Sequence, residues 1–523
     1  MTTPDKLPLR EKFCYGFGDL ASVLYWQTFM VYLTFFYTDV FGLTALAAAA
    51  MIGLSRSIDA FFDPVMGMIA DRTSTRWGKY RPYLLWLCVP FAFAGVLTFT
   101  TPGQAVTARL DGWFGRPMQG ALGSLSTGFH WLGGHGFGWL GLNAVGDMAH
   151  TLSGEVSGAL IWAILTYNLL MVLYTAINIP YTAMLGVISP NSNERTTLSS
   201  IKFIFAFSAG IIISAALLLM AKGLGGGDVR RGWQLAFVII GAAAVVFFLI
   251  TFFNTRERVT PPKSQKTSVA RDLRDLITNV PWLVLLATTI TFILFVAVRS
   301  SVTAHYFKYY VGSHELTIPF MGGPRTYTFE WLVSAFNTSG QIFSLIGVVL
   351  VPFFARRVGK KLAFIFLFVV SVASTAAFYF LKPDQLGLIY GINLVGSLTG
   401  APLSALIWAM YADAADYSEW KHGRRATGLV FSASIFSQKE GWAIGAAVSL
   451  GLMASVGFKA NVDQTADTLH GLRLLMSLIP AAVGVVSILI VAFYPLNEGR
   501  MSQIESELKA RRAAAEPAAE PAA

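Results

Sequence analysis

The stretch SIDAFFDPVMG, residues 57–67, lies inside a longer apolar segment, LAAAAMIGLSRSIDAFFDPVMGMIA, which covers residues 46–70. A run of this length can cross the hydrocarbon core of a membrane as a helix. The segment nevertheless carries Arg56, Asp59 and Asp63, whose spacing of three and four residues places them on one helical face. An ionisable group near the middle of a membrane helix costs roughly 2.5–3.5 kcal/mol, so this face is expected to have a specific role.

The composition extends this interpretation to the whole chain. Of the 523 residues, 54% are hydrophobic and 13% are charged, and the mean hydropathy is +0.57. Soluble globular proteins carry about 25% charged residues. Such a deficit means that most of the surface faces lipid, so the sequence predicts an all-α membrane protein with many spans. The polar beginning of the chain, followed by a span-length run, predicts no cleaved signal peptide.

Twelve apolar stretches are long enough to cross a membrane. They lie at residues 13–41, 45–70, 82–101, 157–187, 198–222, 234–253, 277–311, 327–356, 361–381, 384–412, 424–456 and 470–495. Four of the five inter-span loops on one side are basic, namely residues 71–82, 255–275, 355–361 and 421–425. The positive-inside rule places these loops and both chain termini in the cytoplasm. The net charge of +10 is therefore attributed to topology rather than to nucleic-acid binding.

The long basic stretch after the sixth span divides the chain into two halves of six spans. We expect an N-terminal half over 1–253, a cytoplasmic linker over 254–276, a C-terminal half over 277–500 and a disordered Ala/Glu/Pro tail over 501–523. RWGK after span two and RVGK after span eight occupy equivalent places in the two halves. Two such halves related in parallel are the architecture of the major facilitator fold, with the substrate site between them.

Residues 102–156 are a Gly- and Trp-rich insertion in the first half. By topology they lie outside the cytoplasm, where we expect short interfacial helices rather than an extra pair of spans.

The charges in span two leave two interpretations open. Arg56 and one carboxylate could form a salt bridge that only ties helices together. Two carboxylates against one arginine leave an excess negative charge, however, and in a low-dielectric cavity such a group takes up a proton or binds a cation. We favour this second interpretation for Asp59 and Asp63. Lys439 in span eleven is the natural partner for either of them from the opposite half, whereas Glu440 points about 100° away and is expected to bond within its own half.

A second group of residues suits a sugar. Asp19 opens span one and Trp26 follows on its face, so the carboxylate could accept sugar hydroxyl groups while the indole stacks on the sugar ring. The alternative is a helix-terminal carboxylate beside a packing tryptophan. Tyr174 and Asn178 lie one turn apart ahead of a proline, which loosens the backbone and favours a pocket. Lys202, which begins span five, either joins this site or extends its charge to the cytoplasmic interface.

The sequence gives no support to several other chemistries. It contains no GxxxxGK[ST] loop, so direct use of ATP is not expected. The histidines show no metal-ligand spacing on one helix, and Cys14 and Cys88 both lie in apolar segments. No nucleophile–base pair is evident, so we expect a protein that is not an enzyme and that uses no cofactor other than a coupling cation.

Four runs of sequence resemble the glycoside–pentoside–hexuronide:cation symporters, the melibiose-permease family. They are YGFGDLASVLYWQTFMVYLTFFYTDVFGL (15–43), SRSIDAFFDPVMGMIADRTSTRWGKYRPYLL (55–85), YTAINIPY (174–181) and ADAADYSEWKHGRRATG (412–428). The resemblance covers residues 10–500 apart from 102–156, and it implies a major facilitator fold and cation-coupled sugar transport. It also implies that Asp59 and Asp63 form the cation site, with Thr175 lining it and Lys439 close by.

The same resemblance implies that span-one residues, Asn178 and Lys202 line the sugar site. It further implies a conformational motif on the cytoplasmic side, made up of Arg56, Asp71, Arg72, Gly78, Lys79 and Arg81.

Departures from the family pattern refine the expected cation and substrate. Sodium-using melibiose permeases have an asparagine where this chain has Phe62, which offers no oxygen ligand, so proton coupling is favoured over sodium. They have a Lys–Asp pair in place of Ser22 and Val23, an aspartate in place of Asn178 and a tryptophan in place of Thr182. A pocket with fewer carboxylates is less hostile to an anionic sugar, so a uronide suits it and an α-galactoside is disfavoured.

We therefore expect a monomeric symporter of the bacterial inner membrane that imports a glycoside, pentoside or hexuronide and otherwise contacts lipid. Two other interpretations stay open. One is a lysolipid or drug carrier on the same fold, which would need a lateral apolar opening. The other is a sensor that binds sugar without moving it.

Overall fold

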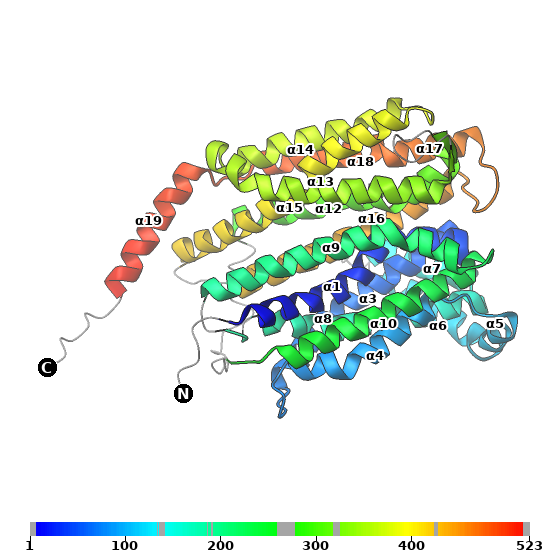
Figure 1. Cartoon of the computed structure of the whole chain (residues 1–523), viewed down its shortest axis with the longest axis horizontal. Helices are drawn as coiled ribbons and strands as arrows, with labels where there is room; N and C mark the ends of the chain where they lie inside the picture. Colours follow the sequence, from blue (N-terminus) through cyan, green and yellow to red (C-terminus); the bar gives the residue numbers. More distant parts are fainter. Residues whose placement is uncertain are drawn as a thin grey trace.

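The computed structural model describes residues 7–132, 134, 142–185, 187–189, 192–258, 278–316, 325–422 and 427–515. Figure 1 shows that the described chain is almost entirely helical. The strands in this part are β1 (His314–Leu316) and β2 (Arg325–Tyr327), which pair antiparallel with His314 opposite Tyr327. The prediction of an all-α fold is confirmed.

The first half contains six long helical segments. They are α1 (Leu9–Val31), continued by α2 (Leu33–Phe35) and η1 (Phe36–Phe41), then α3 (Ala45–Arg72), α4 (Arg81–Thr98), α8 (Gly158–Met184), α9 (Ser192–Leu224) and α10 (Val229–Asn254). The second half contains α12 (Val280–His305) with η5 (Tyr306–Val311), α13 (Phe329–Val358), α14 (Lys360–Ala377) with η6 (Phe378–Phe380), α15 (Leu386–His422), α16 (Thr427–Ser455), and α17 (Ala466–Met476) with α18 (Leu478–Ala492). Each expected span is thus a helical segment. The largest difference is at α15, which continues to His422 where an end near 412 was expected.

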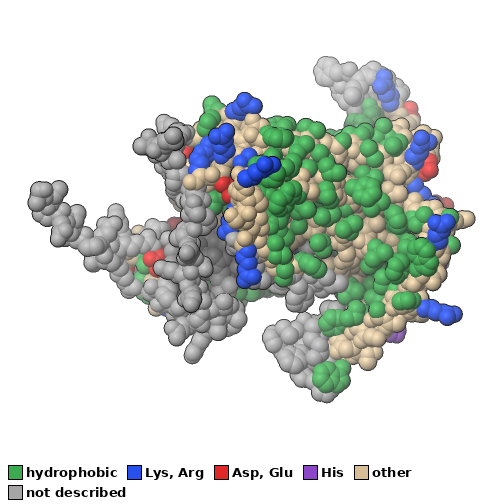
Figure 2. Space-filling view, turned by 90° about the horizontal axis from the view of Figure 1, so that it is seen from below, with side chains coloured by type: hydrophobic (Ala, Val, Ile, Leu, Met, Phe, Trp, Pro, Cys, Tyr) green, Lys and Arg blue, Asp and Glu red, His purple; other side chains and the backbone are tan. Residues whose placement is uncertain are grey.

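The described residues contain nine helices that are long and apolar enough to cross a membrane. The three other expected spans, α1, α3 and α16, are the helices that carry Asp19, Asp63 and Lys439. Figure 2 shows apolar side chains over the middle of the visible face and lysines and arginines towards its two ends. This distribution matches a protein with a lipid-facing belt.

The first and seventh spans end in the same way. The helix α1 continues through the π-helical turn η1 to Gly42, and α12 continues through the π-helical turn η5 to Gly312. Both glycines have a positive φ, +93° and +77°, which a residue with a side chain adopts only at a cost of roughly 1–2 kcal/mol. The same unusual feature at equivalent positions supports the six-span repeat in the sequence.

Glu257 caps the loop that follows α3. Its carboxylate accepts hydrogen bonds from the backbone N–H groups of Lys79 (2.8 Å), Tyr80 (2.7 Å) and Arg81 (2.9 Å) at the start of α4. Gly78 has a φ of +115°, and a Cβ there would lie 2.6 Å from the Glu257 carboxylate. Glycine is therefore required both by the turn and by the close approach of Glu257.

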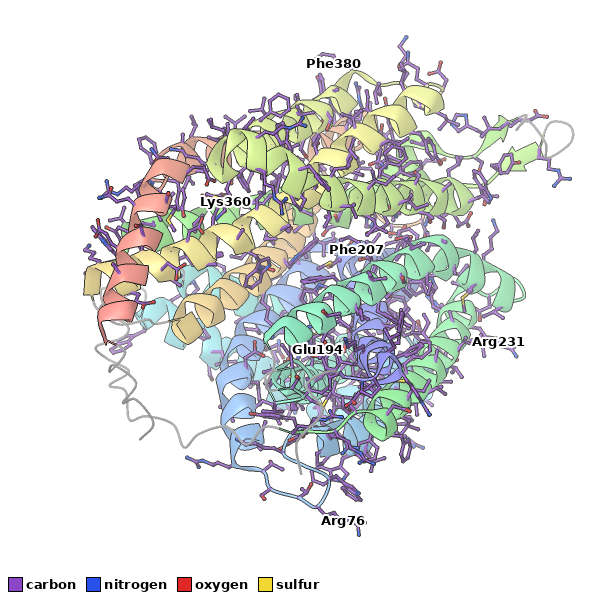
Figure 3. All side chains as sticks on the ribbon, turned by 60° about the vertical axis from the view of Figure 1, so that its left-hand side comes forward. Arg76, Glu194, Phe207, Arg231, Lys360 and Phe380 are labelled. Carbon is purple, nitrogen blue, oxygen red and sulfur yellow. The ribbon has the colours of Figure 1, made fainter. Side chains whose placement is uncertain are left out.

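The loop after α13 is built in a similar way. Gly359 has a φ of +85°, and Glu498 accepts a hydrogen bond from the backbone N–H of Lys360 at 3.0 Å. The Lys360 ammonium group also binds the Asp413 carboxylate at 2.7 Å. Figure 3 labels Arg76 and Lys360, which belong to the two matching motifs RWGK and RVGK. The two matching sequence motifs therefore also have similar local structures.

Replacing Glu257 with alanine is expected to destabilise the protein more than the same change at Glu498. Glu257→Ala leaves three N–H groups at the start of α4 without their carboxylate, and hydrogen bonds to a charged group contribute about 1.5–3 kcal/mol each. Glu498→Ala removes one such bond to backbone. The midpoint of thermal unfolding in detergent measures both, and equal shifts would contradict the capping role of Glu257.

The described part of the insertion consists of short helices. They are α5 (Gln104–Leu110), η2 (Asp111–Gly115), α6 (Arg116–Leu132) and α7 (Leu142–Gly154). None of these described helices is among those long enough to span a membrane. Figure 1 shows α5 and α6 at the opposite end of the bundle from both chain termini. That placement agrees with an insertion on the side away from the termini, and the interfacial location stays a prediction.

The expectation of a disordered tail from residue 501 is wrong as far as Ala515. The helix α19 runs from Glu498 to Ala515. Ile504 and Leu508, one turn apart, are buried in the apolar cluster of the second half, and the Trp420 indole N–H donates to the Glu507 carboxylate at 2.6 Å. This apolar pair anchors the helix against α15, a contact that the Ala/Glu/Pro composition hides.

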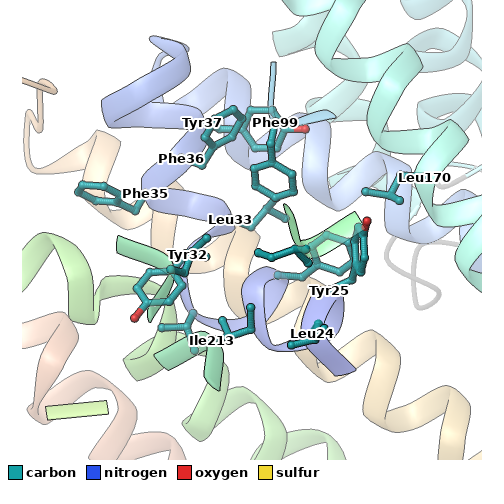
Figure 4. Close-up of a cluster of buried hydrophobic side chains, with 14 of the residues drawn as sticks. Leu24, Tyr25, Tyr32, Leu33, Phe35, Phe36, Tyr37, Phe99, Leu170 and Ile213 are labelled. Carbon is teal, nitrogen blue, oxygen red and sulfur yellow. The ribbon is translucent and has the colours of Figure 1, made fainter. Parts of the chain in front are cut away.

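Aromatic packing fixes α1 within the first half. Figure 4 shows Tyr25, Tyr32, Phe36 and Phe99 in one buried cluster. A Cβ at Gly95 of α4 would lie 2.3 Å from the Tyr25 ring, so the two helices approach closely at this glycine. Close packing of this kind drives helix association in lipid, where the hydrophobic effect between helices is absent.

Candidate cation and substrate sites

Asp63 joins the two halves in the middle of the bundle. The Lys439 ammonium group, from α16 in the second half, donates to Asp63 Oδ2. The Thr175 hydroxyl, from α8, donates to Asp63 Oδ1 at 3.1 Å. The Asp63 and Lys439 side chains are mostly buried, with 22% and 18% of their surface exposed. The structure therefore brings together three of the four residues of the predicted cation site.

The side chain of the fourth, Asp59, lies outside the described residues, and so do those of Arg56, Asp71 and Glu440. Phe62 is described, and its side chain is exposed at the surface of α3. A phenyl side chain offers no oxygen to a cation, and the preference for a proton stays a prediction.

Asp19 and Lys202 form an ion pair within the first half. Lys202 Nζ lies 3.5 Å from Asp19 Oδ1 and 5.4 Å from the centre of the Tyr181 ring. Both side chains are largely buried, with 9% of Asp19 and 18% of Lys202 exposed. The charge of Lys202 is thus turned towards Asp19, and its part in a substrate site stays a prediction.

Trp26 and Tyr174 form an aromatic wall. Their rings stack with centroids 5.6 Å apart and an angle of 21° between planes. The Asn178 amide, one turn along α8, donates to the Tyr174 hydroxyl at 3.5 Å. Tyr174 thus contacts two other residues that were predicted to bind substrate, Trp26 and Asn178. A flat aromatic surface beside amide and hydroxyl groups is suited to the apolar face and hydroxyl groups of a sugar.

The helix α8 connects the two groups. Tyr174 contacts Trp26 and its neighbour Thr175 contacts Asp63, so adjacent residues of one helix reach both sites. The contact between α8 and α1 is close, because a Cβ at Gly18 would lie 2.4 Å from the Tyr181 ring. Neighbouring residues of α8 thus contact Asp63 and the aromatic wall.

A buried network at Asp39 was not predicted. The Asp39 side chain is completely buried, and its carboxylate accepts hydrogen bonds from Lys308 (2.6 Å), Tyr309 and Thr38 (2.7 Å). His305 Nε2 lies 3.1 Å from the same carboxylate. Lys308, Tyr309 and His305 belong to the second half, so the network holds the two halves together. The matching endings FYTDVFG and FKYYVG of spans one and seven are the sequence signal that could have revealed it.

The opposite end of the bundle has ion pairs inside the first half. Lys12 binds Glu194 at 2.7 Å and Arg258 binds Glu11 at 2.7 Å. Hydrogen bonds to the Glu11 carboxylate raise the pKa of Arg258 above its ordinary value. Among the described residues, the hydrogen bonds between halves lie at the level of Asp63 or on the Asp39 side.

The residues of the predicted conformational motif are only partly placed. Arg81 donates through Nη2 to the Phe252 carbonyl at 2.6 Å, which ties α4 to α10, and Gly78 and Lys79 lie in the turn capped by Glu257. Arg72 is exposed at the end of α3. Glu257 was missed because its partners are backbone N–H groups, which a sequence does not display.

Comparison with known proteins agrees with this geometry. The MFS/sugar transport protein family matches residues 14–127 and 144–498, so the family covers part of the insertion as well. The chain is 32% identical over 497 residues to the isoprimeverose transporter of Lactiplantibacillus pentosus, across 94% of this chain and 90% of that protein. It is 30% identical over 510 residues to the putative glycoside/cation symporter YagG of Escherichia coli strain K12, across 97% and 96%.

The fold is similar to the crystal structure of a D-xylose-proton symporter, with a TM-score of 0.57 and 12% identity over 93% of this chain and 97% of that one. At this identity the likeness concerns the fold alone. The resemblance drawn from the sequence motifs is confirmed, and the chain belongs to the MFS/sugar transport protein family as a multi-pass membrane protein.

Proposed function

We propose that this protein is a secondary active symporter of the bacterial inner membrane that imports a sugar together with a cation, with a proton favoured over sodium. The observation that carries the proposal is the position of Asp63, which is bound by Lys439 from one half and by Thr175 from the helix that carries Tyr174. Relatives named as an isoprimeverose transporter and a glycoside/cation symporter support sugar as the substrate class.

Coupling follows from competition for one carboxylate. A cation that binds Asp63 displaces Lys439, and this displacement weakens a contact between the two halves. The same event frees Thr175, beside Tyr174 in the aromatic wall, to adjust to substrate. Linkage then requires that the cation raise the sugar affinity by the factor by which the sugar raises the cation affinity.

The described contacts suit a state that is closed on the Asp39 side. Thr34 donates to the Ser301 carbonyl at 2.7 Å and the Asn461 amide donates to the Asp39 carbonyl at 2.8 Å, and both bonds join the two halves. The basic loops lie at the other end, so in this state substrate would exchange with the cytoplasm. Transport by alternating access then requires the Asp39 network to open once in each cycle.

A proton is favoured because it needs a single carboxylate, whereas a metal cation needs several oxygen ligands. Asp63 and Thr175 are the described oxygen donors, and Phe62 adds none. No catalytic step is required for this activity, and one chain carries both the cation site and the aromatic wall, so we propose a monomer with no enzymatic function and no other cofactor.

Purified protein in proteoliposomes is expected to exchange sugar by counterflow and to accumulate it under a proton gradient. The panel would contain neutral glycosides, xylosides and uronides, each measured under a pH gradient and under a sodium gradient applied separately. The absence of counterflow with every sugar would exclude the symporter and favour a sensor. Accumulation driven by sodium alone would overturn the preference for a proton while leaving the symporter intact.

A further inference from the structure

The second half contains a cavity of about 260 Å³, with polar groups in a partly apolar lining, that none of the sites above uses. It is enclosed by α12, α13, α14 and α15, with α1 and α16 at its edge. Its lining includes Arg299, Asn337, Gln341, Asn393, Gln27 and Trp442, together with several serines. The volume is slightly below the roughly 300–1,000 Å³ of small-molecule sites, and is therefore suited to one sugar ring or its acidic end.

Glycines set the shape of this cavity. A Cβ at Gly340 of α13 would lie 2.9 Å from Ser397 Oγ, and a Cβ at Gly396 of α15 would lie 2.7 Å from Ser374 Oγ. The absence of side chains lets these helices approach each other while their hydroxyl and amide groups face the shared space. Such a lining offers many donors and acceptors to a polyhydroxylated ligand.

Arg299 is the charged group of this cavity. Its Nη2 donates to Asn393 Oδ1 at 3.0 Å, and its guanidinium lies 4.9 Å from the centre of the Phe378 ring. Its Nε is buried without a hydrogen-bond partner, and no described carboxylate is within ion-pair distance of it. The side chain of Glu440 in the same half lies outside the described residues. A cation held in a membrane protein without an anionic partner carries a large desolvation cost, which an anionic ligand would offset.

Two lysines of the membrane interior differ from Arg299, because each has a carboxylate partner. Lys202 is paired with Asp19, and Lys439 is paired with Asp63. Met30 lines the cavity and lies one turn after Trp26 on the same face of α1, an axial rise of about 6 Å. A sugar ring against Trp26 and a group in this cavity are therefore within reach of one small ligand.

We propose that this cavity is an anion subsite in which Arg299 binds the carboxylate of an acidic sugar, while Asn393 orients the guanidinium and the amides and hydroxyls bind the sugar hydroxyl groups. The inference rests on the proposed sugar transport and extends it to a substrate class. A planar guanidinium can donate two parallel hydrogen bonds to a carboxylate, which a neutral hydroxymethyl group cannot accept in the same way.

The test compares methyl uronides with the neutral methyl glycosides of the same configuration, in gluco, galacto and xylo series, by calorimetry on the purified full-length protein. Wild type is expected to bind at least one uronide more tightly than its neutral partner. Arg299→Gln is expected to lower the affinity for that uronide about ten- to a hundredfold and to change the affinity for the neutral glycoside by no more than about twofold. Asn393→Asp supplies an internal counterion to Arg299, so it is expected to reduce uronide binding in the same selective way.

Lys222→Gln serves as the matched control, because it removes a cation that is paired with Glu330 at the end of α9, far along that helix from the cavity. This variant is expected to bind the uronide and the neutral glycoside with the same affinities as wild type. Equal losses for uronide and neutral glycoside in Arg299→Gln would show a structural role and overturn the subsite. Neutral binding without any uronide binding would also overturn it while leaving sugar transport intact, whereas binding of neither class would contradict the proposed function itself.

Discussion

Asp63→Asn is expected to abolish accumulation of sugar against its gradient while leaving exchange of sugar across the membrane in place. The change keeps the shape of the side chain and a carbonyl that can accept from Thr175, but it removes the charge that a cation or Lys439 can bind. A potential of 100 mV acting on one co-transported charge supplies about 2.3 kcal/mol. Wild type could therefore reach roughly fiftyfold accumulation, and the variant is expected to stop at about onefold.

The measurement is uptake in proteoliposomes under an imposed gradient, followed by counterflow in the same preparation. Because Asp63→Asn leaves Lys439 without its partner, the double variant Asp63→Asn/Lys439→Gln is the matched control for folding. It is expected to exchange sugar and still to fail in accumulation. Uphill uptake by either variant would remove Asp63 from the coupling mechanism.

Lys439→Gln alone separates two roles of the ion pair. If Lys439 competes with the cation for Asp63, its removal leaves a free carboxylate, and the cation concentration that activates transport should fall. If the pair only holds the halves together, the activation should be unchanged and the stability reduced. This contrast follows from the position of Lys439 on the opposite half from Asp63.

The sequence predicted the charged part of the site because charge is rare in spans. Lys439 was expected to pair with Asp59 or Asp63, since a lone lysine and an excess carboxylate in lipid each need a partner. Thr175 came from the family resemblance, because a threonine in a helix carries no comparable signal of its own. The spans were equally predictable from the sequence, since each is a long apolar run. Only their ends were wrong, most clearly at α15.

The features that were missed depend on packing, which a sequence does not show. The cavity at Arg299 is lined by neutral serines and amides from helices that are far apart in the chain, and each residue alone is ordinary. Asp39 and Lys308 fall near span ends, where charges usually face water, so their burial was missed although the two span endings resemble each other. The folded part of the tail was missed for a similar reason, because two apolar residues were enough to anchor α19.

Asp39→Asn is expected to shift the protein towards a state that is open on the Asp39 side. The carboxylate is fully buried and binds Lys308, Tyr309 and Thr38, with His305 beside it. Its removal leaves the largely buried Lys308 ammonium group without a carboxylate partner, although the neutral Asn461 Oδ1 still accepts from it at 2.6 Å. Breaking a buried ion pair in this way costs about 3–5 kcal/mol. The cost falls only on the closed state, because the opened halves expose both partners to water. The ratio of closed to open molecules is therefore expected to fall by more than about a hundredfold.

Spin labels at two exposed positions on either side of this network, Leu46 and Val462, measure the opening as a distance distribution. Wild type should give one short distance, and Asp39→Asn should add a longer one. Glu330→Gln is the matched control, since it breaks a more exposed ion pair between the halves, where Lys222 is half exposed and the pair contributes about 0–1 kcal/mol. Identical distributions for the two variants would mean that burial does not set the strength of the gate. A longer distance in Asp39→Asn alone would instead show that one buried carboxylate, at the junction of two matching π-helical turns, decides which side of the protein is open.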